Sequence, residues 1–192
     1  QRIGPTRAVQ SGEISIRQMK MAVVVLGILS VLSAGTLIYA APAINSSTGI
    51  IFYTILAMLC VVAAITYTVG KKAYGYHGLG DLMVFLFFGI VAVSGTKHLF
   101  EEEFSINELF GALAIGAWST MVLNLNNMRD IANDAASGKR TLVVLLGSKN
   151  AKGYHYVLAF LGCSAWIILL YQQAIETENY LILMAGLPVL LF

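Results

Sequence analysis

Residues 21 to 41 read MAVVVLGILSVLSAGTLIYAA and contain no charged side chain. An α-helix needs about 20 predominantly apolar residues to cross the hydrocarbon core of a bilayer, and this segment has that length. A second uncharged segment of the same kind follows at residues 49 to 69. Both segments are therefore predicted to be membrane-spanning helices.

Further apolar segments extend this pattern to the end of the chain. They lack the alternating pattern of barrel strands and are about twice as long as such strands, which favours helices. We expect an all-α fold, a polytopic transmembrane helix bundle with six spans, of which the last is incomplete. The additional segments are residues 82 to 96, which residues 98 to 100 can extend, 109 to 125, 154 to 171 and 180 to 192.

The overall composition agrees with a chain whose main solvent is lipid. Hydrophobic residues make up 58% of the 192 residues and charged residues only 11%, which a soluble domain of this size could hardly bury in one core. The net charge is +2 and no basic block is interleaved with aromatic residues, so no nucleic-acid partner is expected. The expected partner is the lipid bilayer.

The charges between the spans alternate along the chain. Residues 1 to 20, 70 to 81 and 126 to 152 hold every Lys and Arg except Lys97, whereas the intervening connections are uncharged or mainly acidic. Under the positive-inside rule the basic connections face the cytoplasm. The polar motifs lie in these connections, so they are expected on the cytoplasmic side.

The segment after residue 125 carries carboxylates at helical spacing. It reads NNMRDIAND at residues 126 to 134. Asn126, Asp130 and Asp134 are spaced i, i+4, i+8 and would form one polar stripe on a helix. Two carboxylates and an amide oxygen are ligands that Mg²⁺ takes, and a cation would relieve the repulsion between the two aspartates. We therefore predict a Mg²⁺ site with Asn126, Asp130 and Asp134 as ligands and the two aspartates as catalytic residues.

Side chains that suit a diphosphate lie on the same predicted side. Lys139 and Arg140 follow a glycine just after the carboxylates, and Tyr67 and Lys71 are spaced i, i+4 across a predicted helix end. They are candidate diphosphate ligands. Two simpler interpretations stay open at this point, namely a solvated loop that obeys the positive-inside rule and an interfacial tyrosine belt with topology-setting lysines.

Four motifs carry a resemblance to a known family. With them the chain resembles the UbiA superfamily of intramembrane prenyltransferases, in particular its naphthoate-type members. The motifs are GPTRAVQSG at residues 4 to 12, YGYHGLGD at 74 to 81, the Asn126-xxx-Asp130-xxx-Asp134 pattern, and GKRTL at 138 to 142.

The resemblance implies a fold of nine helices around a central cavity, with one Asp-rich motif after the second helix and another after the sixth. Residues 1 to 192 then correspond to part of a single transmembrane prenyltransferase domain, from about the third to the eighth helix. The first Asp-rich motif and the last helix are expected outside this sequence.

The resemblance also implies an activity. It is the transfer of a polyprenyl group from polyprenyl diphosphate to 1,4-dihydroxy-2-naphthoate, with loss of CO₂, to give demethylmenaquinone at the membrane of a bacterial cell. Alternatives are another acceptor such as 4-hydroxybenzoate, or a non-catalytic cation transporter in which the aspartates line a permeation path. Further substrate contacts are expected from Arg7, Tyr74, Asn127 and Arg129.

Overall fold

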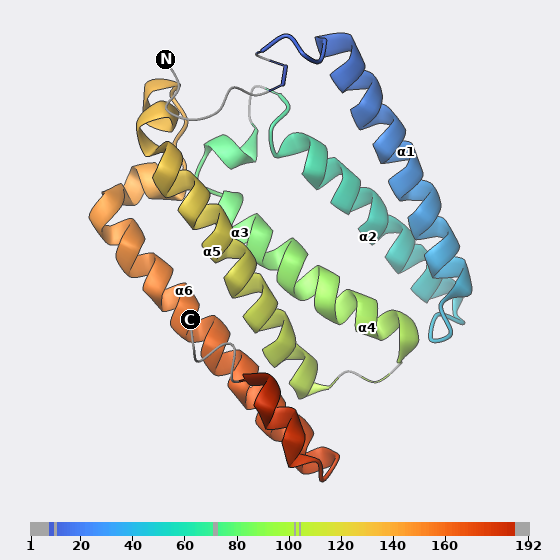
Figure 1. Cartoon of the computed structure of the whole chain (residues 1–192). Helices are drawn as coiled ribbons and strands as arrows, with labels where there is room; N and C mark the ends of the chain where they lie inside the picture. Colours follow the sequence, from blue (N-terminus) through green and yellow to red (C-terminus); the bar gives the residue numbers. More distant parts are fainter. Residues whose placement is uncertain (1–7, 10, 71–72, 102, 104, 187–192) are drawn as a thin grey trace.

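The computed structural model describes residues 8–9, 11–70, 73–101, 103 and 105–186. Within these residues the chain is helical and contains no strand (Figure 1). Two of the described elements are short 3₁₀ helices, and one is a π-helix. The elements are α1 (Ile16–Ala40), α2 (Ser47–Thr66), the 3₁₀ turn η1 (Tyr74–Tyr76), α3 (Gly80–Val84), the π-helix η2 (Phe85–Ser94), α4 (Gly95–Phe100), α5 (Ile106–Ala136), α6 (Leu142–Glu176) and the 3₁₀ helix η3 (Tyr180–Gly186).

Five helical stretches are long and apolar enough to cross a membrane. They confirm the predicted all-α, multi-span architecture, and α3, η2 and α4 join without a break into one of them. The chain is accordingly an integral, multi-pass membrane protein. The stretches are Ile16–Ala40, Ser47–Thr66, Gly80–Phe100, Ile106–Ala136 and Leu142–Glu176.

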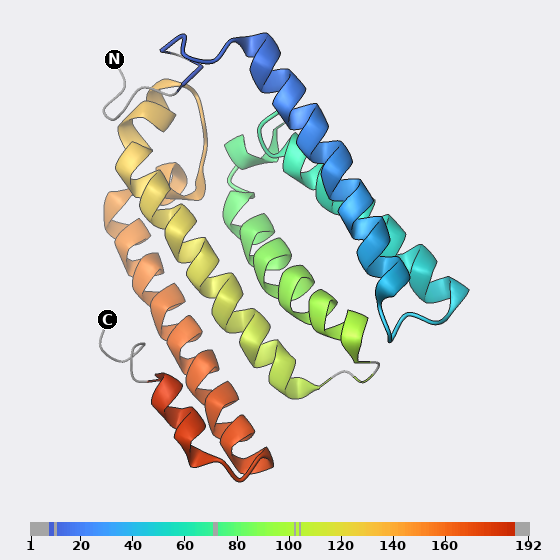
Figure 2. The ribbon, with the colours of Figure 1, turned by 45° about the vertical axis from the view of Figure 1, so that its right-hand side comes forward.

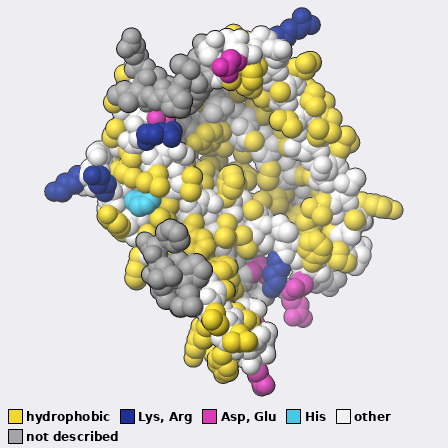
Figure 3. Space-filling view, in the orientation of Figure 1, with side chains coloured by type: hydrophobic (Ala, Val, Ile, Leu, Met, Phe, Trp, Pro, Cys, Tyr) yellow, Lys and Arg dark blue, Asp and Glu magenta, His cyan; other side chains and the backbone are white. Residues whose placement is uncertain are grey.

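The helices form one row in space. The stretch from α3 to α4 lies between α2 on one side and α5 on the other, with α1 outside α2 and α6 outside α5, in both ribbon views (Figures 1 and 2). The outer surface over α1 and α2 is largely hydrophobic, as expected of helices that face lipid (Figure 3).

The connections lie alternately at the two ends of the bundle, as the charge pattern predicts. At one end the Arg140 N–H donates to the Tyr76 carbonyl oxygen at 2.9 Å, which joins the connection after α5 to η1. At the other end the Ala43 N–H donates to the Leu99 carbonyl oxygen at 3.3 Å. The residues expected to carry chemistry therefore share one end.

Helix starts follow local rules of the sequence. Ser15 caps α1 and Ser105 caps α5, each in a capping box whose partner three residues later is Gln18 or Glu108. Thr141 caps α6 by accepting from the Val144 N–H at 3.3 Å. These side chains bind backbone N–H groups that a helix start leaves without partners.

Several helix boundaries differ from the sequence expectations, most clearly around the polar connection and at the end of the described chain. Residues 126 to 152 were expected to connect two spans, but α5 continues to Ala136 and α6 begins at Leu142, with a break at Gly147 (φ 74°). Polar side chains lower hydropathy without ending a helix, so the prediction placed these helix ends too far from the connection. Residues 180 to 192 were expected to begin a span, whereas the described part is the 3₁₀ helix Tyr180–Gly186.

Candidate functional site

The carboxylates lie on the last turns of α5, where the helix leaves the apolar part of the bundle. The Asp130 side chain is 15% exposed and that of Asp134 10% exposed. Both line a polar pocket of about 280 Å³, together with Asn126 from one turn earlier. The three side chains predicted to share one face of a helix therefore line the same pocket.

The opposite wall comes from the connection between α2 and α3, which is distant in sequence. The residues that line the pocket are Tyr67, Thr68, Gly75, Tyr76, Asn126, Asn127, Arg129, Asp130, Asp134, Lys139 and Thr141.

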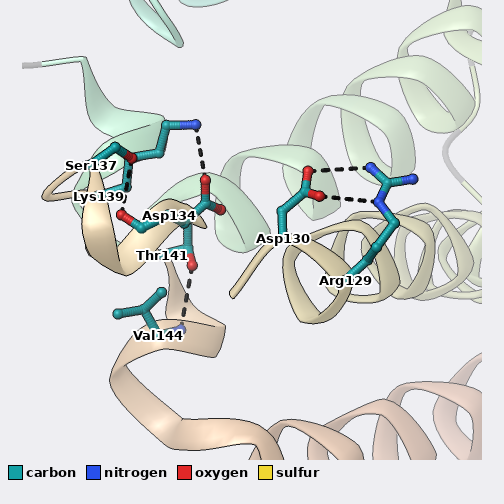
Figure 4. Close-up of polar contacts among 7 residues, drawn as sticks. All are labelled: Arg129, Asp130, Asp134, Ser137, Lys139, Thr141 and Val144. Atoms are coloured by element: carbon teal, nitrogen blue, oxygen red, sulfur yellow. Dashed lines mark hydrogen bonds and ion pairs between the residues drawn. The ribbon is translucent and has the colours of Figure 1, made fainter. Parts of the chain in front are cut away.

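Each carboxylate has a cationic partner (Figure 4). Arg129 donates from Nε and Nη2 to the two oxygens of Asp130, at 3.1 and 3.2 Å. Lys139 Nζ lies 3.1 Å from Asp134 Oδ1 and 4.9 Å from the centre of the Tyr76 ring. Two acidic and two basic side chains thus form two ion pairs, with both carboxylates between the two cations (Figure 4).

The end of α5 fixes where Lys139 lies. Gly138 adopts φ 75°, its N–H donates to the Ala135 carbonyl oxygen, and the Lys139 N–H donates to that of Asp134 at 2.9 Å. These two bonds and the left-handed glycine form a Schellman motif. The motif turns the chain back so that Lys139 stands over the residue five positions before it.

Tyr67 is held in place by the turn that follows it. The Gly75 N–H donates to the Tyr67 carbonyl oxygen at 3.2 Å, and the Tyr74 ring packs edge-on against the Tyr67 ring with centroids 5.4 Å apart. A Cβ on Gly75 would lie 2.7 Å from that carbonyl oxygen, so the turn needs glycine there. Burial, and then the Asp81 carboxylate, raise the pKa of Tyr67 above 10.0. The phenol therefore stays neutral and can donate a hydrogen bond at physiological pH.

A larger apolar cavity adjoins the polar pocket. It has a volume of about 700 Å³ and lies between α2 and the stretch from α3 to α4. Tyr67 lines both cavities, so it marks the border between a charged compartment and an apolar one. The side chains that line the apolar cavity include Cys60, Ala63, Met83, Phe87, Phe88 and Val91. This arrangement suits a molecule with an anionic head and a hydrocarbon tail.

The structure brings together seven of the predicted site residues and separates others. Tyr74 lines the apolar cavity instead and donates its hydroxyl to the Ala63 carbonyl oxygen at 2.7 Å. Arg140 has an exposed side chain that does not line the pocket, and its backbone N–H holds Tyr76. Arg7 and Lys71 lie outside the described residues. The seven that line the pocket are Tyr67, Asn126, Asn127, Arg129, Asp130, Asp134 and Lys139.

The predicted pairing of Tyr67 with Lys71 on one helical face stays a prediction. The helix α2 ends at Thr66, and Gly70 has φ 103°, which is outside the helical region. The sequence pattern placed the end of this span at residue 69 because residues 67 to 69 carry no charge.

Four pocket residues were not predicted, and one buried acid was overlooked. Gly75, Tyr76 and Thr141 lie in the motifs at residues 74 to 81 and 138 to 142 but received no role, and Thr68 was not singled out. Asp81 is 4% exposed in the first turn of α3, and its Oδ1 has no hydrogen-bond partner among the described residues. An ionisable residue at the start of an apolar span is such a signal.

The donor set of the pocket fits a hard divalent cation. Nowhere in the described part of the chain do three or more His, Cys, Asp or Glu side chains gather as a metal-binding group. The pocket supplies two carboxylates and the Asn126 amide, which leaves coordination positions for substrate oxygens and water, as is usual for Mg²⁺.

Comparison with known proteins gives one family over the whole chain. Residues 1–192 match the UbiA prenyltransferase family. No solved structure gives a significant match.

Three similar bacterial proteins are described as 1,4-dihydroxy-2-naphthoate octaprenyltransferase. The protein from Haemophilus influenzae is 38% identical over 185 residues, which cover 96% of this chain and 59% of the relative. The protein from Escherichia coli is 43% identical over 157 residues, or 82% and 50% of the two chains. The protein from Mycobacterium tuberculosis is 36% identical over 170 residues, or 88% and 56%. The chain thus spans between half and three fifths of the length of these relatives.

Proposed function

The chain belongs to the UbiA prenyltransferase family, and from that premise we propose that the intact protein prenylates 1,4-dihydroxy-2-naphthoate. The donor is a polyprenyl diphosphate, and the product is demethylmenaquinol, the reduced form of demethylmenaquinone. The allylic C–O bond breaks and diphosphate leaves, the ring carbon forms the new C–C bond, and the ring carboxylate is lost as CO₂. The similar proteins from three bacteria, which are described as 1,4-dihydroxy-2-naphthoate octaprenyltransferases, support this acceptor.

One observation carries the proposal: Tyr67 lines both the polar pocket and the apolar cavity. A prenyl diphosphate has its charged head and its reactive allylic carbon next to each other, so it needs such a border. The apolar walls would take the prenyl tail and keep water from the allylic centre.

The chemistry of the side chains in the polar pocket suggests a role for each in binding the metal or the diphosphate. We assign Asn126, Asp130 and Asp134 to a divalent metal, which UbiA prenyltransferases generally use, and we propose Mg²⁺. When bound, Mg²⁺ would withdraw charge from the diphosphate and make it a better leaving group. Tyr67 and Lys139 would bind the diphosphate oxygens, with Lys71, Arg140, Arg129 and Asn127 as further ligands.

The proposal extends to the rest of the domain and to the side of the membrane on which the pocket opens. We propose that residues 1 to 192 form part of one prenyltransferase domain, that a further Asp-rich motif of the intact protein completes the metal site, and that the pocket opens to the cytoplasm. Tyr74 and Arg7 are proposed substrate contacts, and Tyr74 would act from the apolar side.

Membranes that contain the intact protein test the proposal. They would be supplied with radiolabelled polyprenyl diphosphate and 1,4-dihydroxy-2-naphthoate, with Mg²⁺ or with EDTA. We expect a lipid-soluble labelled product that requires Mg²⁺ and that the Asp134→Asn variant does not form.

The other outcomes discriminate between the remaining functions. A product with 4-hydroxybenzoate alone would keep the chemistry and change the acceptor. No product with any acceptor, combined with Mg²⁺ flux into vesicles, would favour the transporter. Normal turnover by Asp134→Asn would remove the metal assignment.

A further inference from the structure

The described lining residues of the polar pocket include two acidic and two basic side chains. They are Arg129, Asp130, Asp134 and Lys139, and the formal charges of these four cancel. A divalent cation alone must compete with Arg129 and Lys139 for the carboxylates. A diphosphate alone would add negative charge beside the same carboxylates.

The contact between Arg129 and Asp130 is not a helix-stabilising pair. Side chains at i and i+1 on a helix do not face each other, whereas stabilising pairs are spaced i, i+3 or i, i+4. The guanidinium nevertheless folds back to contact both carboxylate oxygens, at 3.1 and 3.2 Å. Because the Arg129 side chain is 63% exposed, it can leave this position without unpacking the core.

The contact between Lys139 and Asp134 has a different origin. In a Schellman motif the C″ residue usually makes a hydrophobic contact with the C3 residue. Here Lys139 is C″ and Asp134 is C3, and an ion pair of 3.1 Å takes the place of the hydrophobic contact. Since the backbone bonds hold the turn by themselves, the ammonium group can move to another anion while the turn stays intact.

We propose that Arg129 and Lys139 are exchangeable counter-ions: they neutralise Asp130 and Asp134 before the substrate arrives and transfer to the diphosphate oxygens when metal and diphosphate enter together. This inference rests on the proposed function of the site. Each ligand removes the obstacle to the other, so metal and diphosphate bind with positive, reciprocal coupling. The exchange also keeps the site from holding a metal ion firmly without substrate.

The experiment uses the intact protein in detergent or nanodiscs, with Mn²⁺ and inorganic pyrophosphate as probes. Electron paramagnetic resonance of free Mn²⁺ gives the affinity for the metal alone. Binding of [³²P]pyrophosphate at saturating Mn²⁺ gives the affinity for the pair. We expect Lys139→Gln to bind Mn²⁺ alone about fivefold more tightly, because a competing cation is gone, and to bind pyrophosphate with Mn²⁺ about tenfold more weakly. Arg129→Gln should likewise bind Mn²⁺ alone more tightly and pyrophosphate with Mn²⁺ more weakly than the wild type.

Matched variants separate the exchange from a general change in charge. Lys149 is exposed, does not line the pocket and lies in the neighbouring helix α6, so Lys149→Gln should change either affinity by less than twofold. Lys139→Arg keeps the charge, so its affinities for Mn²⁺ alone and for pyrophosphate with Mn²⁺ should rank as they do in the wild type. Unchanged or weaker Mn²⁺ binding in both Lys139→Gln and Arg129→Gln would overturn the exchange.

The two proposals fail in different ways. Coupled binding of Mn²⁺ and pyrophosphate without prenyl transfer would overturn the proposed reaction and leave the exchange standing. Prenyl transfer with Mn²⁺ affinity that does not depend on pyrophosphate would overturn the exchange and leave the reaction standing. A wild-type protein that binds no Mn²⁺ would overturn both the metal assignment and the exchange.

Discussion

Gly89 of η2 and Gly116 of α5 lie against each other, close enough that a Cβ on Gly89 would be 2.8 Å from the Gly116 Cα. The same Cβ would lie 2.6 Å from the Ala112 carbonyl oxygen. Small residues let helix backbones approach closely where lipid gives no hydrophobic drive for association. This contact holds the central stretch against α5, and so it sets the position of one wall of the apolar cavity.

Gly89→Ala should therefore destabilise the bundle. We expect a loss of about 1–3 kcal/mol in the free energy of unfolding, because the atoms that the new methyl group meets belong to backbone and cannot move aside. Unfolding of the intact protein in mixed detergent micelles would measure it. Gly95→Ala is the matched control on the same stretch, since a Cβ on Gly95 has no heavy atom within 4 Å. Equal stability of the two variants would contradict the packing argument.

Much of the fold was predictable because the bilayer limits what a chain can do. Apolar length identified the first two helices, although α1 begins at Ile16, five residues before the predicted start. The change of pitch to a π-helix at Phe85–Ser94 was not predicted. It belongs to the segment that packs against α5, and such contacts between distant segments have no periodic signal in one sequence.

The site was predictable where its residues share one helix. Asn126, Asp130 and Asp134 follow helical spacing and line the same pocket, as predicted. Tyr76 and Gly75 were missed because they reach the pocket through the contact between two distant connections. Arg140 was predicted as a phosphate ligand from its guanidinium group and its position after a glycine near the carboxylates. In the structure its side chain is exposed, and its backbone N–H donates to the Tyr76 carbonyl oxygen.

Gly75→Ala should impair the substrate site more than the fold. The new Cβ would lie 2.7 Å from the Tyr67 carbonyl oxygen and 3.1 Å from its ring, so Tyr67 must shift. If Tyr67 binds the diphosphate, we expect kcat/KM for the donor to fall at least tenfold, since small displacements of positioning groups are costly. Gly153→Ala has no atom within 4 Å of its Cβ and serves as control. Unchanged kcat/KM in Gly75→Ala would show that the position of Tyr67 does not matter for turnover.

Tyr67 should make stability depend on pH in the alkaline range. Burial is the main cause that raises its pKa, so above pH 10.0 the unfolded phenol ionises while the folded one stays neutral. The contribution of Tyr67 to the free energy of unfolding is fully present below pH 10.0, and it is lost as the pH rises toward the pKa of Tyr67 in the folded protein. We expect Tyr67→Phe to lose less stability than the wild type over this range. Tyr39→Phe, whose parent side chain is 93% exposed, should follow the wild-type curve. Identical slopes for Tyr67→Phe and wild type would refute the role of burial.

At the end of the bundle opposite the polar pocket, Lys97 should hold a buried carboxylate in place. Its Nζ lies 3.4 Å from Glu108 Oε2, and the Glu108 side chain is only 3% exposed. Lys97→Met would leave that carboxylate buried without its cation, and we expect the free energy of unfolding to fall by about 2 kcal/mol. This loss is smaller than for a fully buried pair because the Lys97 side chain is 30% exposed. The double variant Lys97→Met/Glu108→Gln removes the unpaired charge and should recover most of the loss. Glu101→Gln, which removes the exposed partner of Lys97, should cost less than about 0.5 kcal/mol. A double variant no more stable than Lys97→Met, measured by unfolding in mixed micelles, would show that the buried charge is not what Lys97 compensates.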